Sequence, residues 1–121
     1  LAARNRGSLM AGPIYPVDIE KALIELSGRL EEEVEIFAEI SLQRAEAESE
    51  YKRQYHRTII QMTDGTVTQK ESMAQVKSAV AFREWKIAEA QEKATQQKLM
   101  AIRTQIESLR TISANVRAAA S

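Results

Sequence analysis

Apolar residues in positions 17–62 recur at spacings of three and four, which is typical of one face of an α-helix. The members of this stripe are Leu23, Leu26, Leu30, Val34, Phe37 and Ile40. Two prolines exclude a regular helix from residues 10–16, so we predict a helix from Val17 to about Met62. Gly28 predicts a kink or a division, and we expect a short N-terminal helical segment before a long helix.

The strongest turn signal in the chain is Asp64-Gly65, which predicts a turn near residues 63–67. Thr68 and Glu71 then match a capping box, and no Gly or Pro follows, so we predict one uninterrupted helix to about Ala119. Its first apolar face consists of Met73, Val76, Val80, Ile87, Ala90 and Ala94. A stripe with near-heptad spacing continues it through Leu99, Ile102, Ile106, Leu109, Ile112 and Val116.

Two long helices joined by a short turn bury their stripes by folding back on each other. The predicted fold is therefore all-α, a long antiparallel helical hairpin that forms one domain over residues 17–121. Residues 10–16 form a non-helical lead in this interpretation. We interpret residues 1–9 as left over from an expression vector, with Met10 as the native start.

A two-helix hairpin has almost no interior, and several large apolar side chains fall outside a single seam. These are Ile36, Phe37, Leu42, Phe82 and Trp85. We therefore expect a helical homo-oligomer that assembles through the C-terminal stripe, Leu99, Ile102, Ile106, Leu109, Ile112 and Val116, together with Trp85. A lone Trp on a helix most often packs at an interface or a helix junction, and contact with a different partner is the alternative for Trp85.

The composition argues against an enzyme. The chain has no cysteine and a single histidine, His56. Thiolate metal sites, histidine metal sites and Ser-His or Cys-His catalysis each need a partner that is missing, so we expect no metal and no cofactor. No apolar run is long enough for a membrane span or a signal peptide, which favours a cytoplasmic location without membrane association.

The net charge of zero hides an acidic segment followed by a basic one. Residues 16–50 carry eleven acids against three bases, whereas residues 51–86 carry seven bases against three acids. Positive charge beside aromatic rings is what a single-stranded nucleic acid requires, because cations contact phosphates and rings stack on bases. The candidate nucleic-acid-binding residues are Lys52, Arg53, Tyr55, His56, Arg57, Lys70 and Lys77, and Arg83 and Lys86 continue the positive face.

Each charged segment has a simpler interpretation. The basic run could be an ordinary solvated helix face, with Tyr51 and Tyr55 in the seam. The acidic run "EEEVE" at residues 31–35 lacks the histidine, aspartate or loop ligands of a metal or acid–base site. We interpret it as a solvated face, with docking of a basic partner protein as the alternative.

The layout resembles the UvsY family of phage recombination mediators over about residues 17–118. The segments that carry the resemblance are "EYKRQYHR" before "DG", "KESMAQV" and "IRTQIESLRTISANVR". The resemblance implies a non-enzymatic ring that binds single-stranded DNA non-specifically and helps a recombinase displace a single-strand-binding protein in an infected bacterium. It assigns phosphate contacts to Lys52, Arg53 and Arg57. The alternative is a structural helical assembly factor, such as a virion scaffold, a tail chaperone or a prefoldin-like holdase, with no role at nucleic acid.

Overall fold

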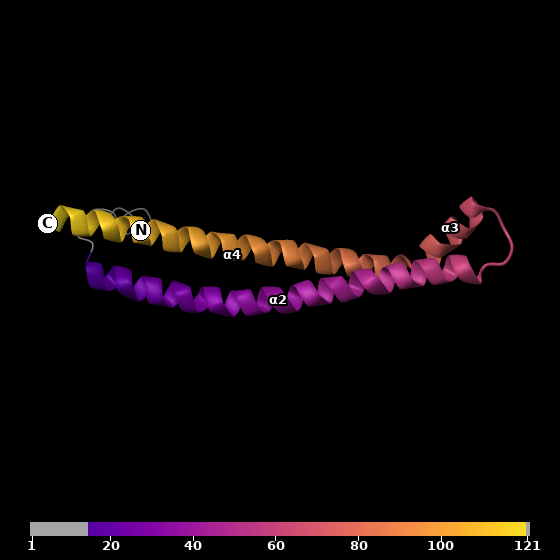
Figure 1. Ribbon diagram of the computed structural model, residues 1–121, viewed down its shortest axis with the longest axis horizontal. Helices are drawn as coiled ribbons and strands as arrows, with labels where there is room; N and C mark the ends of the chain where they lie inside the picture. Colours follow the sequence, from indigo (N-terminus) through magenta and orange to yellow (C-terminus); the bar gives the residue numbers. More distant parts are fainter. Residues whose placement is uncertain (1–14, 121) are drawn as a thin grey trace, which may run out of the picture. The chain divides into compact units, whose positions relative to one another are not determined.

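The computed structural model describes residues 15–120, and this part of the chain is helical apart from short connections. The helices are α2 (Pro16–Gln61), α3 (Val67–Lys77) and α4 (Ala79–Ala120), and no strand occurs between residues 15 and 120 (Figure 1). The all-α prediction is therefore confirmed. Residues 1–9 and most of the predicted lead at 10–16 lie outside the described residues.

Helix α2 runs without interruption through Gly28, so the prediction of a separate short N-terminal segment is wrong. A Cβ added to Gly28 would meet nothing within 4 Å, which means that no close contact requires a glycine there. The cost of one glycine in a helix, roughly 0.5–1 kcal/mol, is small beside the packing of the apolar stripe on both sides of it. Tertiary packing therefore outweighs the local preference.

The connection between α2 and α3 contains the predicted Asp64-Gly65 turn. Gly65 has φ of 111°, a backbone conformation that residues with a Cβ avoid. The capping box lies two residues earlier than predicted. The Gln69 amide N–H donates to the Thr66 hydroxyl at 3.1 Å, and the Thr66 N–H donates to the Gln69 side chain at 3.0 Å. The cap thus starts α3 directly after the turn.

Ser78 divides the predicted second helix into α3 and α4, so the expectation of one uninterrupted helix is wrong. Ser78 is fully buried, and its hydroxyl donates to the Ala74 carbonyl at 2.6 Å. A serine that bonds back to the preceding turn often bends a helix. Figure 1 shows α3 turning away from the axis of α4 at this point.

The chain divides into two compact units, and each is described by itself. The first contains residues 15–31 and 100–120 of the described chain. Its buried side chains are Ile19, Ile102 and Ile106, with Leu23, Leu26, Leu30, Leu109 and Val116 half-buried around them. This unit therefore has an aliphatic core.

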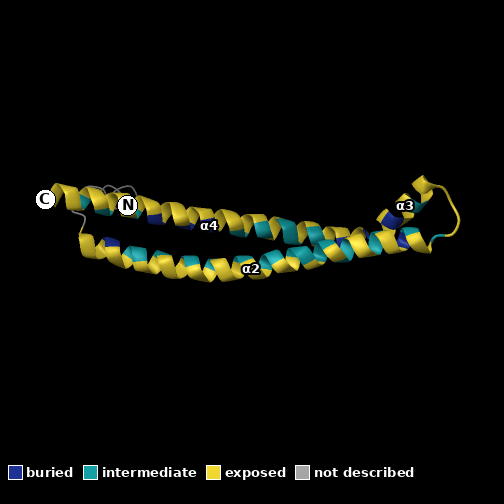
Figure 2. Ribbon diagram, viewed as in Figure 1, coloured by how far each residue is buried: buried dark blue, intermediate teal, exposed yellow. Residues whose placement is uncertain are grey.

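The second unit contains residues 32–99, and its buried positions carry smaller and more polar side chains, with half-buried Phe37, Ile40, Tyr51 and Trp85 beside them. The buried residues are Thr58, Ala74, Ser78, Ala81 and Leu99. Contacts within the unit join Glu33 to Lys98, Arg44 to Glu92 and Tyr51 to Trp85. From the second contact to the third, a step of seven residues forward in α2 matches a step of seven backward in α4. The buried and half-buried positions form bands along the helices (Figure 2).

The second unit buries a different face of α3 and α4 from the one predicted. The expected face, Met73, Val76, Val80, Ile87, Ala90 and Ala94, is exposed. The buried or half-buried face lies one residue further along, at Ala74, Ser78, Ala81, Trp85 and Ala88. Four of these five side chains are small, which lets helix backbones approach closely, and the fifth, Trp85, stacks on Tyr51 of α2.

Candidate nucleic-acid interface

The predicted basic segment lies in the last four turns of α2, but two of its cations have acidic partners within the same helix. The Lys52 ammonium is 3.3 Å from the Glu48 carboxylate, and the Arg53 guanidinium contacts Glu50. These exposed pairs are solvent-screened and easily exchanged. Their positive charge is nevertheless partly neutralised, so Lys52 and Arg53 are weaker phosphate ligands than the sequence suggested.

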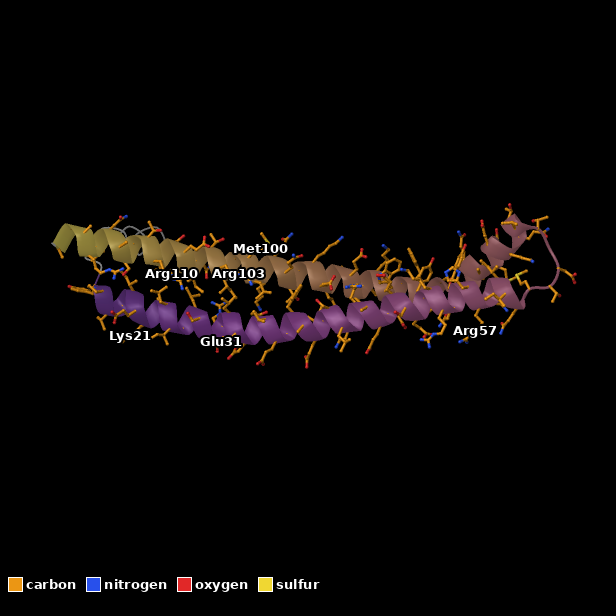
Figure 3. The ribbon with its side chains drawn as sticks, viewed as in Figure 1. Lys21, Glu31, Arg57, Met100, Arg103 and Arg110 are labelled. Atoms are coloured by element: carbon orange, nitrogen blue, oxygen red, sulfur yellow. The ribbon has the colours of Figure 1, made fainter. Side chains whose placement is uncertain are left out.

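Four other cations of the second unit form no ion pair with any residue between 15 and 120. They are Arg57 on α2, Lys70 and Lys77 on α3, and Arg83 on α4. Arg57, Lys77 and Arg83 are exposed and Lys70 is half-buried. Figure 3 shows the Arg57 side chain extending outward from α2. The available positive charge therefore comes from all three helices of this unit.

The aromatic side chains form a cluster that the sequence analysis did not predict as a whole. The Tyr51 ring stacks on the Trp85 ring with centroids 5.4 Å apart, and the Phe82 ring meets Tyr51 edge-on at 5.2 Å. The Tyr55 ring lies 6.0 Å from Tyr51 and 5.6 Å from the exposed ring of His56. Tyr51 thus belongs to the seam, whereas Tyr55 stands half-buried at its edge. The signal for this cluster was the i, i+4 spacing of the two tyrosines opposite "FREW".

Trp85 packs inside the unit, with Lys86 beside it. The Lys86 ammonium lies 4.3 Å from the Trp85 ring centroid and 5.6 Å from that of Phe82, which is a cation–π arrangement. The Trp85 indole N–H is buried without a hydrogen-bond partner in the described structure. The half-buried Trp85 is therefore held by Tyr51 and Lys86 of its own chain.

A cavity of about 290 Å³ opens beside this cluster. Its lining consists of Tyr51 from α2, Gln75 from α3, and Ser78, Ala79 and Phe82 around the bend. Phe82 is 42% exposed and presents part of its ring to solvent. The cavity combines aromatic faces with one amide side chain, a surface on which a flat ring can stack.

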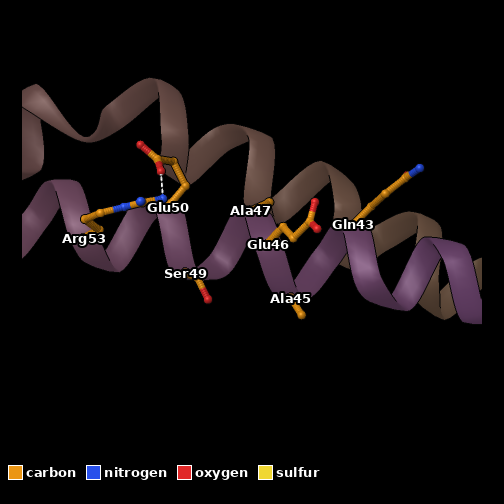
Figure 4. Close-up of a pocket in the computed structure, with 7 residues that line it drawn as sticks. All are labelled: Gln43, Ala45, Glu46, Ala47, Ser49, Glu50 and Arg53. Carbon is orange, nitrogen blue, oxygen red and sulfur yellow. Dashed lines mark hydrogen bonds and ion pairs between the residues drawn. The ribbon is translucent and has the colours of Figure 1, made fainter.

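A second hollow lies on α2 alone and is open to solvent. Figure 4 shows its lining, which is Gln43, Ala45, Glu46, Ala47, Ser49, Glu50 and Arg53. The pKa of the Glu50 carboxyl is lowered, chiefly by a hydrogen bond from the Gln54 amide and further by Arg53 and Arg57. Three of its lining residues, Ala45, Ala47 and Ser49, have small side chains.

Two ion pairs join α2 to α4 in the second unit, Lys98–Glu33 at 2.7 Å and Arg44–Glu92. The Arg44 Nε–H donates to both carboxylate oxygens of Glu92, at 3.1 and 3.2 Å, and a terminal nitrogen of Arg44 reaches Glu48 at 3.3 Å. The hydrogen bond to Glu92 is the largest of the effects that raise the pKa of Arg44. A charged pair therefore occupies a seam position that an apolar layer would ordinarily fill.

The residues predicted to join subunits are mostly used inside the chain. Leu99, Ile102 and Ile106 are buried, and Leu109 and Val116 are half-buried. Only Ile112 of that stripe is exposed. In this conformation the three buried side chains are covered by the chain itself, and the predicted role of the stripe in assembly stays a prediction.

Neither a cluster of metal ligands nor a membrane-spanning helix occurs among the described residues. No group of three potential metal ligands comes together between residues 15 and 120. Within the same range, no helix combines the length and the apolar character needed to cross a membrane. Compared with known protein families, known proteins and solved structures, the chain shows no significant similarity to any of them.

Proposed function

We propose that this protein binds single-stranded DNA non-specifically and acts as a recombination mediator rather than as an enzyme. In this proposal α2 folds against α3 and α4 as an antiparallel helical hairpin, several copies assemble, and the assembly helps load a recombinase in place of a single-strand-binding protein. The contacts from Arg44 to Glu92 and from Tyr51 to Trp85 support the hairpin, because their order reverses between the two helices.

The observation that carries the proposal is the group of unpaired cations in the second unit. Arg57, Lys70, Lys77 and Arg83 form no ion pair among the described residues, although Arg57 lies close enough to Glu50 to contribute to the lowered pKa of that carboxyl, so most of their charge is available to an external anion. Lysine and arginine bind a phosphate backbone without regard to sequence and release counterions as they do so. Cations spread over three helices suit a long polyanion better than a single small anion.

The aromatic edge favours a single strand over a duplex. Tyr55 and Phe82 expose part of their rings near these cations, and the cavity beside Phe82 offers Gln75 as a polar contact. Bases of a single strand are free to stack on such rings, whereas paired bases are not. We therefore assign base stacking to Tyr55 and Phe82, and phosphate contact to the unpaired cations.

A structural helical assembly factor without a nucleic-acid role is the second candidate. The observation in its favour is the number of large apolar side chains left exposed, among them Val76, Val80, Ile87 and Leu42. Contiguous exposed apolar surface marks an interaction site. Assembly is common to both candidates, so binding of DNA is what separates them.

The test is fluorescence anisotropy with labelled oligo-dT over a series of salt concentrations. We expect the logarithm of the affinity to fall linearly with the logarithm of salt concentration, by about 0.7 for each phosphate contacted on a single strand. Replacing Arg57 and Lys77 together by Gln removes two unpaired cations and should reduce that slope by about 1.4. Lys52→Gln with Arg53→Gln should have a smaller effect, because both side chains already pair with glutamates.

The matched control is Lys21→Gln with Arg29→Gln. These side chains are also exposed and also lack an ion pair in the described structure, but they belong to the first unit. The control should leave the slope unchanged. Equal affinity for single- and double-stranded DNA would reduce the site to a plain basic patch. Absence of binding at the lowest salt concentration would leave only the structural assembly factor.

A further inference from the structure

The outer face of α3 and α4 in the second unit carries an apolar stripe that nothing in the described chain covers. It consists of Met73, Val76, Val80, Ile87, Ala90 and Ala94, with Val80 70% and Ile87 48% exposed. Lys86 and Lys93, which are seven residues apart, border the part of the stripe at Ile87, Ala90 and Ala94, whereas the exposed Arg83 stands between Val80 and Ile87 and separates this part from Met73, Val76 and Val80. Both of these lysines share one distant partner, Glu89, at 3.5 and 3.7 Å.

The outer face of α2 in the same unit has the opposite charge. Leu42, which is 60% exposed, lies between Ala38 and Ala45 on this face. Glu39 and Glu46 border it and are also seven residues apart. Neither glutamate forms an ion pair in the described part of the chain, and both are exposed. This face includes part of the shallow hollow of Figure 4, where the side chains of Ala45 and Ser49 are small.

We propose that the outer face of α2 of one copy binds the outer face of α3 and α4 of a second copy. The inference rests on the homo-oligomer of the proposed function and identifies the surface that builds it. Leu42 and its neighbouring alanines pack against Ile87, Ala90 and Ala94. Glu39 and Glu46 pair with Lys86 and Lys93, because the two glutamates and the two lysines are each seven residues apart.

A second copy fits these faces better than an unrelated partner does. Each face supplies charge that the other lacks, namely two unpaired carboxylates on α2 and, on α4, two lysines that share the single carboxylate of Glu89. Small residues in each stripe allow the helices to approach closely. Since the two faces differ, the contact is heterologous, and repeating it gives a closed ring or an open filament.

The apolar part of the interface is tested by Ile87→Asp in sedimentation velocity without DNA. The substitution places a charge in the centre of the stripe, so we expect the wild-type oligomer to dissociate and the apparent dissociation constant to rise at least tenfold. Ile24→Asp is the matched control. Ile24 is also exposed but lies on α2 in the first unit, and its replacement should leave the oligomer intact.

The pairing itself is tested by reversing charges. Glu39→Lys with Glu46→Lys should dissociate the oligomer by setting like charges against Lys86 and Lys93. Adding Lys86→Glu and Lys93→Glu to the same chain restores opposite charges in every contact and should restore the oligomer. Helicity and Trp85 emission are measured for each variant, because Lys86 also lies over the Trp85 ring.

Each outcome decides one question. A wild-type protein that sediments as a monomer at tens of micromolar overturns the inference. So does an oligomer that survives Ile87→Asp, or a fourfold variant that stays dissociated although it is folded. The oligo-dT titration of the wild-type protein tests the DNA site separately. An oligomer that depends on both faces but binds no DNA would uphold the interface and overturn the proposed function.

Discussion

At the scale of single residues, the least expected feature is the charged pair Arg44–Glu92 in the seam. We expect Arg44→Leu to lower the urea midpoint of unfolding, because the half-buried Glu92 carboxylate loses its partner. Arg44→Leu with Glu92→Leu should regain that midpoint or exceed it, since apolar replacement of both members removes the cost of holding charges in the seam. Lys52→Leu is the comparison: it breaks an exposed pair, and we expect almost no change.

A second prediction at the scale of single residues concerns Ser78. Its side chain is fully buried, so Ser78→Leu should force α2 and the bend apart and destabilise the protein by about 1–3 kcal/mol. Ser78→Ala should change stability by less than about 0.5 kcal/mol, because the Ala74 carbonyl still accepts the backbone N–H of residue 78. Ala114→Leu, at an exposed position of α4, controls for the added side chain. Equal urea midpoints for the two leucine variants would contradict close packing at Ser78.

At the scale of the helix connections, two glycines should respond oppositely to the same substitution. Gly65→Ala puts a Cβ on a backbone with φ of 111°, 3.1 Å from the Gln69 oxygen that closes the capping box. We expect a loss of about 1–2 kcal/mol. Gly28→Ala should stabilise the protein by roughly 0.5–1 kcal/mol, since the site is helical and open. Urea unfolding followed by circular dichroism measures both, and effects of the same sign would contradict this account.

The helical elements could be predicted from sequence because their signals are local. The three-and-four spacing of the apolar residues, the turn at Asp64-Gly65 and the absence of later glycine and proline determine where helices form. The break at Ser78 could not be predicted, since a serine within a helical pattern is compatible with a straight helix. Ser78 is fully buried and lines a cavity together with Tyr51 of α2, and such tertiary packing cannot be read from a local sequence pattern.

The buried face of α3 and α4 was missed for a related reason. A hydrophobicity pattern favours the stripe with Val76, Val80 and Ile87, whereas the helices pack through Ala74, Ser78 and Ala81. Close approach of backbones depends on small side chains, which score weakly on any hydrophobic scale. The basic character of the candidate site could be read directly from the sequence. The sequence does not predict which of these cations form ion pairs, because the pairs depend on the rotamers of Glu48 and Glu50.

At the scale of the whole molecule, the two units differ in the side chains that they bury. The first buries isoleucines, whereas the second buries mainly alanine, serine and threonine side chains together with Leu99. Because stabilisation grows with the apolar area removed from water, the second unit should unfold at lower urea. Trp85, the only tryptophan of the chain, reports on that unit, so its emission should change before the circular dichroism signal is fully lost.

A core substitution in the first unit sharpens this prediction. Ile106→Ala should cost about 2–5 kcal/mol and move the late part of the circular dichroism transition to lower urea. It should leave the Trp85 transition almost unchanged. Ile112→Ala, at an exposed site of the same helix, is the control. Coincident fluorescence and circular dichroism curves in every variant would mean that the helices unfold as one cooperative body.

The Arg44–Glu92 contact also bears on how the chain finds its alignment during folding. The side chains that face the other helix recur every seven residues in both helices. A shift of one helix by seven residues relative to the other would therefore place similar side chains opposite each other at most positions. The Arg44–Glu92 position is the exception. After such a shift Arg44 would face Trp85 or Leu99, and Glu92 would face Phe37 or Tyr51. Glu92 would then lose water without gaining a partner, and Arg44 would keep only Glu48 of its own helix. The pair thus favours the native alignment of the two helices. A chain that folds with the helices shifted by seven residues is less stable and unfolds again before it reaches the native pairing.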